Sequence, residues 1–474
     1  QDRAQVLCNI SCLRGCSDRH CIISSIMWSL RPLSWVTLLA LPGLAWAVPM
    51  KKHLMPEKGL EGMGAVCIDG TDAGFYFAPA TVASAAKSWQ LYFEGGGWCY
   101  DELDCWGRAH SNLGSSKKWP KTMLSGGLMS DDCKLNPDFC NVNRVVFKYC
   151  DGNSFSGNRD EPVKVTGPDG VALPLYFRGK RIIDAVLDTL LEKMGLAEAE
   201  EVLLTGCSAG GLATYLHADY VHDRLKQAVP GLKKMRAAPI SGMFLLHKSA
   251  EGKAVYPEEI KNIFHLANST RGVNQRCIAA KPEHDHWMCN FAEISYRYTE
   301  TPIFVLNSAL DSWQVKCIWA AALLPGFPNQ TGTANGHCDA LKPWKKCTSS
   351  PERCGDEQID DLNQYMTDFG HVMDGTETYS KEGNGAFVVS CYEHCEANYD
   401  SWNKFVIDGL TIQQAFSAWW KSDGSEPAKK HTYSDCQYRR NMTPHMCNPT
   451  CSKSSLTSYP ALWSVDDDMP LLQV

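Results

Sequence analysis

The stretch from Glu201 to Gly211, EVLLTGCSAGG, constrains the fold more than any other part of the chain. Its first half is a short apolar run, which is typical of a strand covered on both faces. Leu212, Tyr215 and Leu216 then recur at helical spacing. The hydrophobic period therefore changes at Ser208, and the sequence predicts a strand that turns there directly into a helix.

The residues around Ser208 fit the G-x-S-x-G pattern of a nucleophile elbow, with glycines at 206 and 210. Small residues on both sides of the serine allow a tight turn that presents the hydroxyl at the edge of the sheet. A helix that begins there also directs unpaired N–H groups and the positive end of its dipole toward a nearby oxyanion. The pattern alone is weak, but its position between a strand and a helix is the required context.

Residues 27–47 have the features of a secretory signal peptide. They contain a short segment with Arg31, an apolar run, and the small-x-small cleavage pattern Ala45-Trp-Ala47. The apolar run is shorter than the roughly 20 residues that cross a membrane, and Pro42-Gly43 interrupts it. We therefore expect cleavage before Val48, secretion of the mature chain and no stable membrane insertion.

Composition agrees with an extracellular globular protein. The 474 residues are 44% hydrophobic and 21% charged, which permits a large core. Removing residues 1–47 changes the net charge from −7 to −9 and leaves 18 of the 22 cysteines. An acidic chain without a basic patch argues against a nucleic-acid partner. The cysteines predict disulfides of undetermined pairing, and the absence of paired C-x-x-C sets argues against zinc.

Strands and helices alternate along the chain. Apolar runs predict four more buried strands, at 89–93, 145–147, 302–306 and 386–389. Helical periodicity or composition predicts helices at 182–194 and 360–369. This alternation predicts an α/β fold, a mostly parallel sheet with helices on both faces, and the long cysteine-bearing segments predict disulfide-stapled loop insertions. In such sheets the ligand site lies outside the carboxyl ends of the strands.

Asp311 and His394 are the candidate partners of Ser208. A serine hydroxyl is a poor nucleophile until a base takes its proton, and a carboxylate must orient that base. In α/β hydrolases the chain order is serine, acid, histidine, with the last two in loops after later strands. Both residues satisfy these conditions. Asp311 also fits a turn or helix N-cap, and the strand before it favours the acid.

The other histidines have simpler interpretations. His371 competes with His394 as the base, but it follows a polar helical segment rather than a buried strand. Packing, surface or loop roles are expected for His217, His222, His284 and His286, and the last two lack a third ligand for a metal.

The glycine-rich segment 95–98 follows the predicted strand at 89–93. It is the kind of segment that supplies an oxyanion-hole N–H opposite that of Ala209. A plain turn is the alternative, but three consecutive glycines cost entropy, which favours a close approach of backbone to ligand. Trp98 and Tyr100 are candidates to line an acyl or sugar pocket, and burial in the core fits them nearly as well.

Six motifs together resemble the pectin acetylesterase family, which also contains the Wnt-deacylating carboxylesterase Notum. They occur in the family's order between about residue 60 and about residue 425: FEGGGWC (93–99), YCDGNSFSG (149–157), FRGKR (177–181), GCSAGG (206–211), NSALDSWQ (307–314) and SCYEHC (390–395). The region 252–289 resembles the family poorly, and Cys436 to Cys451 only loosely. Substrate contacts in 252–289 are therefore not carried over.

The resemblance implies an α/β-hydrolase fold and assigns each site residue a role. It implies Ser208 as nucleophile, Asp311 as acid and His394 as base, with oxyanion donors at Gly97, Trp98 and Ala209. We expect a secreted serine carboxylesterase that removes small acyl groups, chiefly O-acetyl from a polysaccharide such as pectin, with no metal or organic cofactor.

Two alternatives remain open. A Notum-like deacylase acting on a long acyl chain of a protein serine needs a deeper apolar pocket, and the sequence does not reveal pocket depth. A catalytically silent extracellular binding module predicts loss of at least one triad residue, and none is lost.

The expected organisation has four parts: an upstream non-native or unstructured segment at 1–26, a signal peptide at 27–47, the hydrolase domain at 48–428 and a cysteine-containing tail at 429–474. Asn268-Ser-Thr and Asn329-Gln-Thr match glycosylation acceptors, so we expect a glycoprotein. Asn441-Met-Thr is a weaker match because Pro444 follows it.

Overall fold

The computed structural model describes residues 48–322, 338, 340–427, 429–432 and 448–451. These residues belong to one unit, Trp46–Val474. The predicted upstream segment, the signal peptide, most of the tail and the acceptors at Asn329 and Asn441 lie outside the described residues. Within the described ranges, no helix has the length and apolar character needed to cross a membrane.

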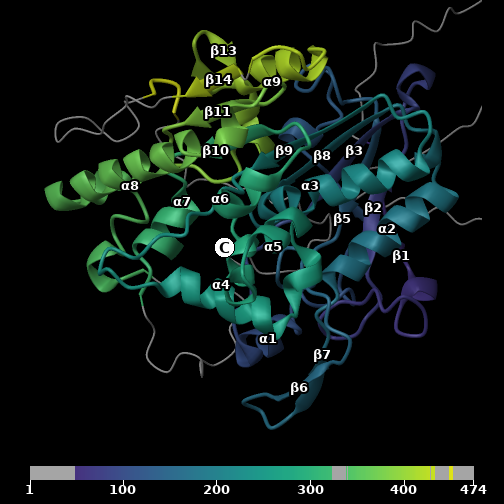
Figure 1. The fold of residues 1–474 in the computed structure, drawn as a ribbon, viewed down its shortest axis with the longest axis horizontal. Helices are drawn as coiled ribbons and strands as arrows, with labels where there is room; N and C mark the ends of the chain where they lie inside the picture. The colour runs from purple at the N-terminus through teal and green to yellow at the C-terminus, as the bar shows by residue number, and fades with distance from the viewer. Residues whose placement is uncertain (1–47, 323–337, 339, 428, 433–447, 452–474) are drawn as a thin grey trace, which may run out of the picture. The chain divides into compact units, whose positions relative to one another are not determined.

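A ten-stranded sheet lies at the centre of the described fold, in the order β14-β11-β10-β9-β8-β3-β5-β2-β1-β4 (Figure 1). Its parallel part comprises β3 (Ser88–Phe93), β5 (Asn143–Phe147), β8 (Glu201–Cys207), β9 (Lys234–Ile240), β10 (Phe304–Ser308), β11 (Gly385–Val389) and β14 (Lys429–Thr432). At one edge β1 (Met50–Leu54), β2 (Gly74–Ala78) and β4 (Thr122–Met123) pair antiparallel. The prediction of a mostly parallel sheet is therefore confirmed.

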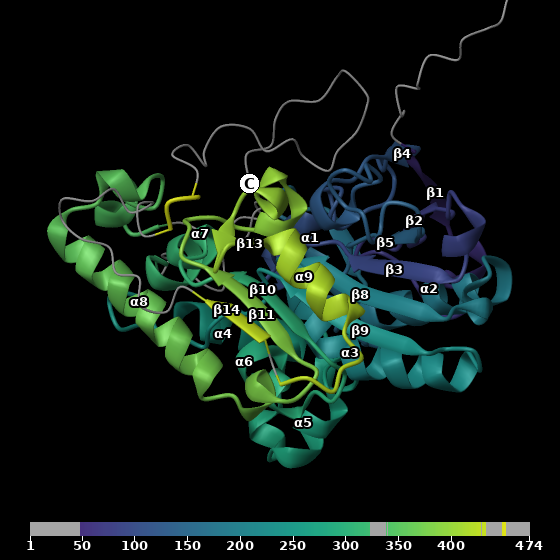
Figure 2. The ribbon, with the colours of Figure 1, turned by 90° about the horizontal axis from the view of Figure 1, so that it is seen from above.

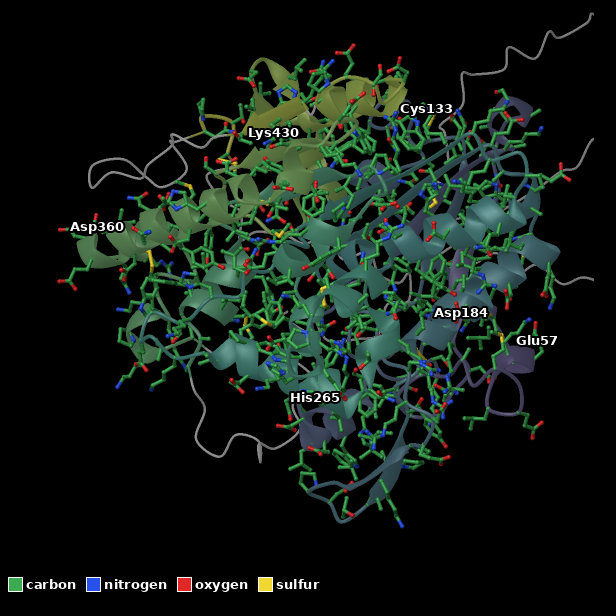
Figure 3. The ribbon with its side chains drawn as sticks, viewed as in Figure 1. Glu57, Cys133, Asp184, His265, Asp360 and Lys430 are labelled. Atoms are coloured by element: carbon green, nitrogen blue, oxygen red, sulfur yellow. A yellow bond between two sulfur atoms is a disulfide. The ribbon has the colours of Figure 1, made fainter. Side chains whose placement is uncertain are left out.

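Helices cover both faces of the sheet, as predicted. The longer ones are α2 (Gly179–Lys193), α3 (Ala209–Ala228), α4 (Val255–Leu266), α8 (Asp356–Asp374) and α9 (Ile412–Lys421). Shorter elements are α1 (Glu102–Arg108), α5 (Gln275–Ala280), α6 (Ala292–Ser295), α7 (Ser312–Gln314), and the hairpins β6 (Val163–Thr166) with β7 (Ala172–Leu175) and β12 (Val406–Ile407) with β13 (Leu410–Thr411). The outer face of α8 is polar, and Asp360 points away from the sheet (Figure 3).

Successive strand residues enter two different cores, because side chains of a strand alternate between its faces. Val202 and Leu204 of β8 pack with residues of α2, α3, α4 and α8. Leu203 packs on the opposite face with residues of α9, which lies across the sheet in Figure 2. The apolar run that predicted a doubly covered strand therefore has apolar partners on both sides.

Several elements differ from the sequence prediction. The chain between Val48 and the predicted strand at 89–93 contains β1 and β2, which its polar and glycine-rich composition did not predict. β9 was also missed, because Arg236 interrupts its apolar pattern. Arg236 is nevertheless buried, since its guanidinium donates hydrogen bonds to the backbone carbonyl of Ser422 at 2.8 Å and to that of Trp419.

Eight disulfides connect the described cysteines, which confirms the expected stapling of the loops. Figure 3 shows sulfur atoms in several parts of the fold, including the insertion that contains Cys133. The pairs are Cys67–Cys150, Cys99–Cys105, Cys133–Cys140, Cys207–Cys395, Cys277–Cys289, Cys317–Cys338, Cys347–Cys354 and Cys391–Cys451.

Several buried carboxyl groups have a pKa well above the ordinary value for their type. Burial raises the pKa of Asp104 to about 7, that of Asp151 to about 6 and that of Glu396 to about 7. When a carboxyl has a higher pKa in the folded state than in the unfolded state, the folded state binds more protons. Its stabilising contribution is therefore present at low pH and is lost as the pH rises through the folded pKa.

We expect the melting temperature to fall as the pH rises from about 4.5 to about 7, and Glu396→Gln to reduce this fall. The amide keeps an acceptor for the Ser241 hydroxyl, which donates to Glu396 at 2.9 Å, but it cannot ionise. Circular dichroism melts at several pH values measure the slope. Glu61→Gln, at an exposed position, serves as the control. Equal slopes for Glu396→Gln and the unaltered protein would contradict the expectation.

Candidate active site

Ser208 alone forms the turn between β8 and α3, as the elbow pattern predicts. Its backbone has φ 60° and ψ −127°, a conformation that L-residues rarely adopt. A Cβ at Gly206 would lie 2.5 Å from the Gly210 carbonyl oxygen, and a Cβ at Gly210 would lie 2.0 Å from that of Phe93. The turn therefore requires glycine on both sides of the serine.

The backbone of Ser208 is fixed, whereas its hydroxyl is free. Its N–H donates to the carbonyl of Ile240 at 3.0 Å, and its carbonyl accepts from the N–H of Leu212 at 2.9 Å. The side-chain hydroxyl has no hydrogen-bond partner among the residues that the structure describes. The residue is 9% exposed and therefore almost fully buried.

Asp311 follows β10 and is fully buried. Its Oδ1 accepts the N–H groups of Trp313 and Gln314, each at 3.0 Å, and thereby caps α7. Its Oδ2 accepts from Nδ1 of His394 at 2.8 Å. One carboxylate thus fills both roles that the sequence left open, the helix cap and the partner of the histidine.

His394 lies in the loop after β11, and a disulfide joins this loop to the elbow. Cys395, which follows His394, is bonded to Cys207, which precedes Ser208, with their Cα atoms 5.7 Å apart. When Nδ1 donates to the carboxylate, Nε2 keeps the lone pair that a base needs. The described residues show no hydrogen bond between the Ser208 hydroxyl and His394, and such bonds are often long without substrate. The relay from serine to histidine is therefore a proposal.

The glycine-rich segment 95–98 passes directly beside the elbow. A Cβ at Gly95 would lie 2.2 Å from the carbonyl oxygen of Cys207 and 2.9 Å from Cβ of Ser208. Gly96 and Gly97 have φ values of 142° and 62°, which favour glycine. The glycines therefore allow the segment to pack closely against the backbone of the elbow, and the expected close approach to a ligand stays a prediction.

Three N–H groups near the serine have no acceptor. Those of Gly97 and Trp98 make no hydrogen bond within the described part of the chain. That of Ala209 belongs to the first turn of α3, where no intrahelical acceptor exists. These are the three donors that the resemblance implied, and their catalytic role remains a proposal.

Aromatic rings pack together beside His394. Trp98 lies 4.9 Å from Phe244 and 5.3 Å from Trp313 between ring centroids, and Phe244 and Trp313 lie 5.2 Å apart. The imidazole lies 6.3 Å from Phe244 and 6.5 Å from Trp313. Tyr256 packs against Trp98 at 5.8 Å. The cluster therefore borders His394 and the glycine-rich segment 95–98, hereafter the oxyanion segment.

Trp98 and Tyr100, the predicted pocket residues, are both buried. The indole N–H of Trp98 donates to the hydroxyl of Ser154 at 2.8 Å, which fixes the ring within the aromatic cluster. The backbone carbonyl of Tyr100 accepts from Asn262 at 2.6 Å. Burial favours the core interpretation of both residues, and a substrate contact stays a prediction.

Phe244 is a site residue that sequence reasoning missed. It follows β9, and that strand was not predicted because of Arg236. The sequence signal that could have revealed this strand is AAPISGMF at 237–244, a run of small and apolar residues that ends at the carboxyl edge of the sheet.

Two more carboxyl groups flank His394. Burial raises the pKa of Glu393 to about 8 and that of Glu396 to about 7, and each is also raised by the charge of Asp311. In the neutral form they do not repel the Asp311 carboxylate. The negative charge facing the imidazole is then carried by Asp311 alone among these three residues.

The competing histidines lie away from this arrangement. His217 is buried in α3, and burial lowers its pKa to about 3, so it is a neutral core residue. His371 lies on the exposed face of α8. The one metal-like grouping found among the described residues is Cys207, His394 and Cys395, and its two cysteines are bonded to each other.

Comparisons with known proteins identify the family of this chain. The Pectinacetylesterase family profile matches residues 50–452. Pectin acetylesterase 5 of Arabidopsis thaliana is 31% identical over 398 residues, which cover 83% of each chain. Pectin acetylesterase 4 of the same plant is 32% identical over 391 residues, 82% of this chain and 85% of the relative.

More distant similarity extends to Notum. Palmitoleoyl-protein carboxylesterase NOTUM of Mus musculus is 26% identical over 398 residues, 81% of this chain and 69% of the relative. The crystal structure of the Wnt deacylase Notum from Drosophila superposes with a TM-score of 0.66 at 23% identity, covering 85% of this chain and all of that one. The chain therefore belongs to the pectinacetylesterase family, and it is a carboxylic-ester hydrolase with an α/β-hydrolase-like fold.

Proposed function

We propose that this enzyme removes acetyl groups from O-acetylated carbohydrate through Ser208, His394 and Asp311. The observation that carries the proposal is the 2.8 Å contact between His394 Nδ1 and Asp311 Oδ2, in a loop that a disulfide joins to the elbow. The names of the plant relatives support acetyl as the acyl group and pectin as a polymer of the right class.

The reaction proceeds through an acetyl-enzyme. Ser208 Oγ attacks the ester carbonyl while His394 Nε2 takes its proton, and Asp311 stabilises the resulting imidazolium. The carbonyl oxygen becomes negative and accepts the free N–H groups of the oxyanion segment and α3. The ester C–O bond then breaks, and His394 protonates the leaving alcohol. Water attacks the acetyl-enzyme in the same way and releases acetate.

The packing beside His394 favours a short acyl group. Trp98, Phe244 and Trp313 occupy the space that borders the base, with ring centroids only 4.9–5.3 Å apart. A palmitoleoyl chain, which the Notum relatives remove according to their name, requires a deep apolar pocket at the serine.

The acceptor is proposed as an extracellular carbohydrate. Eight disulfides and the signal-like segment at 27–47 support secretion. The negative charge of the chain does not attract a polyanion such as unesterified pectin. Recognition of a heavily esterified or neutral stretch of polymer is therefore the form of the proposal that agrees with the electrostatics.

Hydrolysis of 4-nitrophenyl esters of increasing acyl length tests the proposed function. We expect kcat/KM to fall by about tenfold or more from acetate to octanoate, because the aromatic cluster leaves little room for added methylenes. We expect Ser208→Ala to lose about 10⁴-fold or more in kcat, and Ser417→Ala on α9 to behave like the unaltered enzyme. Turnover that survives in Ser208→Ala, or a preference for octanoate, would refute the proposal.

Removing an aromatic ring beside His394 should shift the preference of the enzyme from short toward longer acyl chains. We expect Phe244→Ala to raise the octanoate-to-acetate ratio of kcat/KM by about tenfold, because the lost ring leaves space beside His394. Phe416→Ala, at a buried aromatic position of α9, is the matched control for the packing lost, about 3–5 kcal/mol in each case. An equal ratio in both variants would show that the cluster does not limit acyl length.

A further inference from the structure

We propose that Arg108 is the positioning residue of the oxyanion hole. Its guanidinium holds the carbonyl groups of the segment 95–98 on one side of the backbone, so that the N–H groups of Gly97 and Trp98 face the serine. The inference rests on the proposed serine mechanism and extends it to a residue outside the triad and the donors themselves.

Three of the four hydrogen bonds that the Arg108 guanidinium donates go to backbone oxygens of this segment, and the fourth, from Nε, goes to the carbonyl of Leu113 at 3.2 Å. Nη2 donates to the carbonyl of Gly96 at 2.8 Å and to that of Gly97 at 3.3 Å, and Nη1 donates to that of Trp98 at 3.3 Å. The hydroxyl of Tyr149 donates to the Gly97 carbonyl at 2.8 Å. Three successive carbonyls are therefore held by one planar cation and one phenol.

Because each peptide bond is planar, these contacts of the carbonyl groups also determine the direction in which the N–H groups point. In a trans peptide the carbonyl and the N–H of the next residue point in opposite directions. The Gly96 carbonyl shares its plane with the N–H of Gly97, and the Gly97 carbonyl shares its plane with the N–H of Trp98. Because both carbonyls point toward Arg108, both N–H groups point away from it. These are the two N–H groups of the segment that the resemblance implied as donors, and neither has an acceptor among the described residues.

The burial of Arg108 contributes little to the stability of the fold. It is 1% exposed, and none of the described carboxylates lies within ion-pairing distance of it. Its longer-range electrostatic partners are Asp104 and Asp151, and burial raises the pKa of these carboxyl groups to about 7 and about 6. Burying a cation without an ion pair costs free energy, which hydrogen bonds to carbonyls offset only in part. A catalytic benefit accounts for retaining such a group.

The element that carries Arg108 is itself fixed to the segment. Arg108 is the last residue of α1, and Cys105, one turn earlier, forms a disulfide with Cys99 directly after Trp98, with Cα atoms 5.0 Å apart. The guanidinium also lies over the ring of Tyr149, 5.1 Å from its centroid. The cation and the segment therefore move as one body.

Arg108 also polarises the peptides that it holds. A charged donor on a carbonyl draws electron density toward the oxygen and makes the N–H of the same peptide a stronger donor. When the substrate oxygen becomes negative, the N–H groups are already oriented and polarised, so no reorganisation is needed. The benefit therefore arises in the transition state rather than in substrate binding.

The experiment compares Arg108→Lys with Arg144→Lys. Lysine keeps the charge but cannot reach three carbonyls at once. Arg144 of β5 is equally buried and also donates to backbone carbonyls, those of Met129 and Val48. Unlike Arg108 it also pairs with Asp131 at 3.5 Å, and its hydrogen bonds reach neither the elbow nor the segment 95–98. Measurements are kcat and KM with 4-nitrophenyl acetate, the inhibition constant of methylboronic acid, and the melting temperature.

We expect Arg108→Lys to lower kcat by about a hundredfold while KM stays within about twofold of the native value. The inhibition constant of methylboronic acid should rise by a factor similar to the loss in kcat. Methylboronic acid mimics the tetrahedral state, because its boron bonds to the serine oxygen and its own oxygens occupy the oxyanion position. Arg144→Lys should keep the native kcat. Tyr149→Phe, which removes the hydrogen bond to the Gly97 carbonyl and the acceptor of the Ser154 N–H, should lower kcat by about tenfold with KM unchanged.

Two outcomes separate this inference from the proposed function. If Ser208→Ala is inactive while Arg108→Lys and Tyr149→Phe keep native kcat and boronic acid affinity, the positioning role is overturned and the serine mechanism stands. If Ser208→Ala retains activity, the proposed function itself fails. If Arg108→Lys does not fold, the test of the positioning role relies on Tyr149→Phe alone. A native kcat in that variant then overturns the inference.

Discussion

The close packing of three backbone segments at the end of β8 is the constraint on which the site depends. Side-chain atoms at Gly206, Gly210 or Gly95 would lie 2.0–2.5 Å from neighbouring carbonyl oxygens. This proximity leaves Ser208 at the tip of the turn in a left-handed conformation and places the segment 95–98 against it. The proposed nucleophile and the proposed oxyanion donors are thus positioned by the same backbone contact.

Side chains then complete what the backbone begins. The disulfide between Cys207 and Cys395 joins the elbow to the histidine loop, and Asp311 fixes the imidazole while capping α7. On the other side, Arg108 holds the oxyanion segment by its carbonyls. The aromatic cluster borders both halves. Each support reaches the site from a different strand or helix, so the site exists only in the complete fold.

Local patterns in the sequence were sufficient to propose a triad, but not the residues that would support it. Ser208, Asp311 and His394 were proposed because each comes after a buried apolar strand, and parallel strands bring their carboxyl ends to one edge. β9 and Phe244 were missed because Arg236 breaks the strand pattern, and its carbonyl partners in and after α9 lie far away in sequence. Arg108 was missed because a residue that binds backbone oxygens leaves no motif. Its role depends on contacts that only the fold creates.

The most direct test of the account is a crystal structure of the enzyme with methylboronic acid. The account predicts boron bonded to Oγ of Ser208, one boronate oxygen about 2.7–3.1 Å from the N–H nitrogens of Gly97, Trp98 and Ala209, and Nε2 of His394 in contact with Oγ. The account would be contradicted by boron bonded to another atom, or by boronate oxygens that point to solvent and accept no hydrogen bond from those three N–H groups.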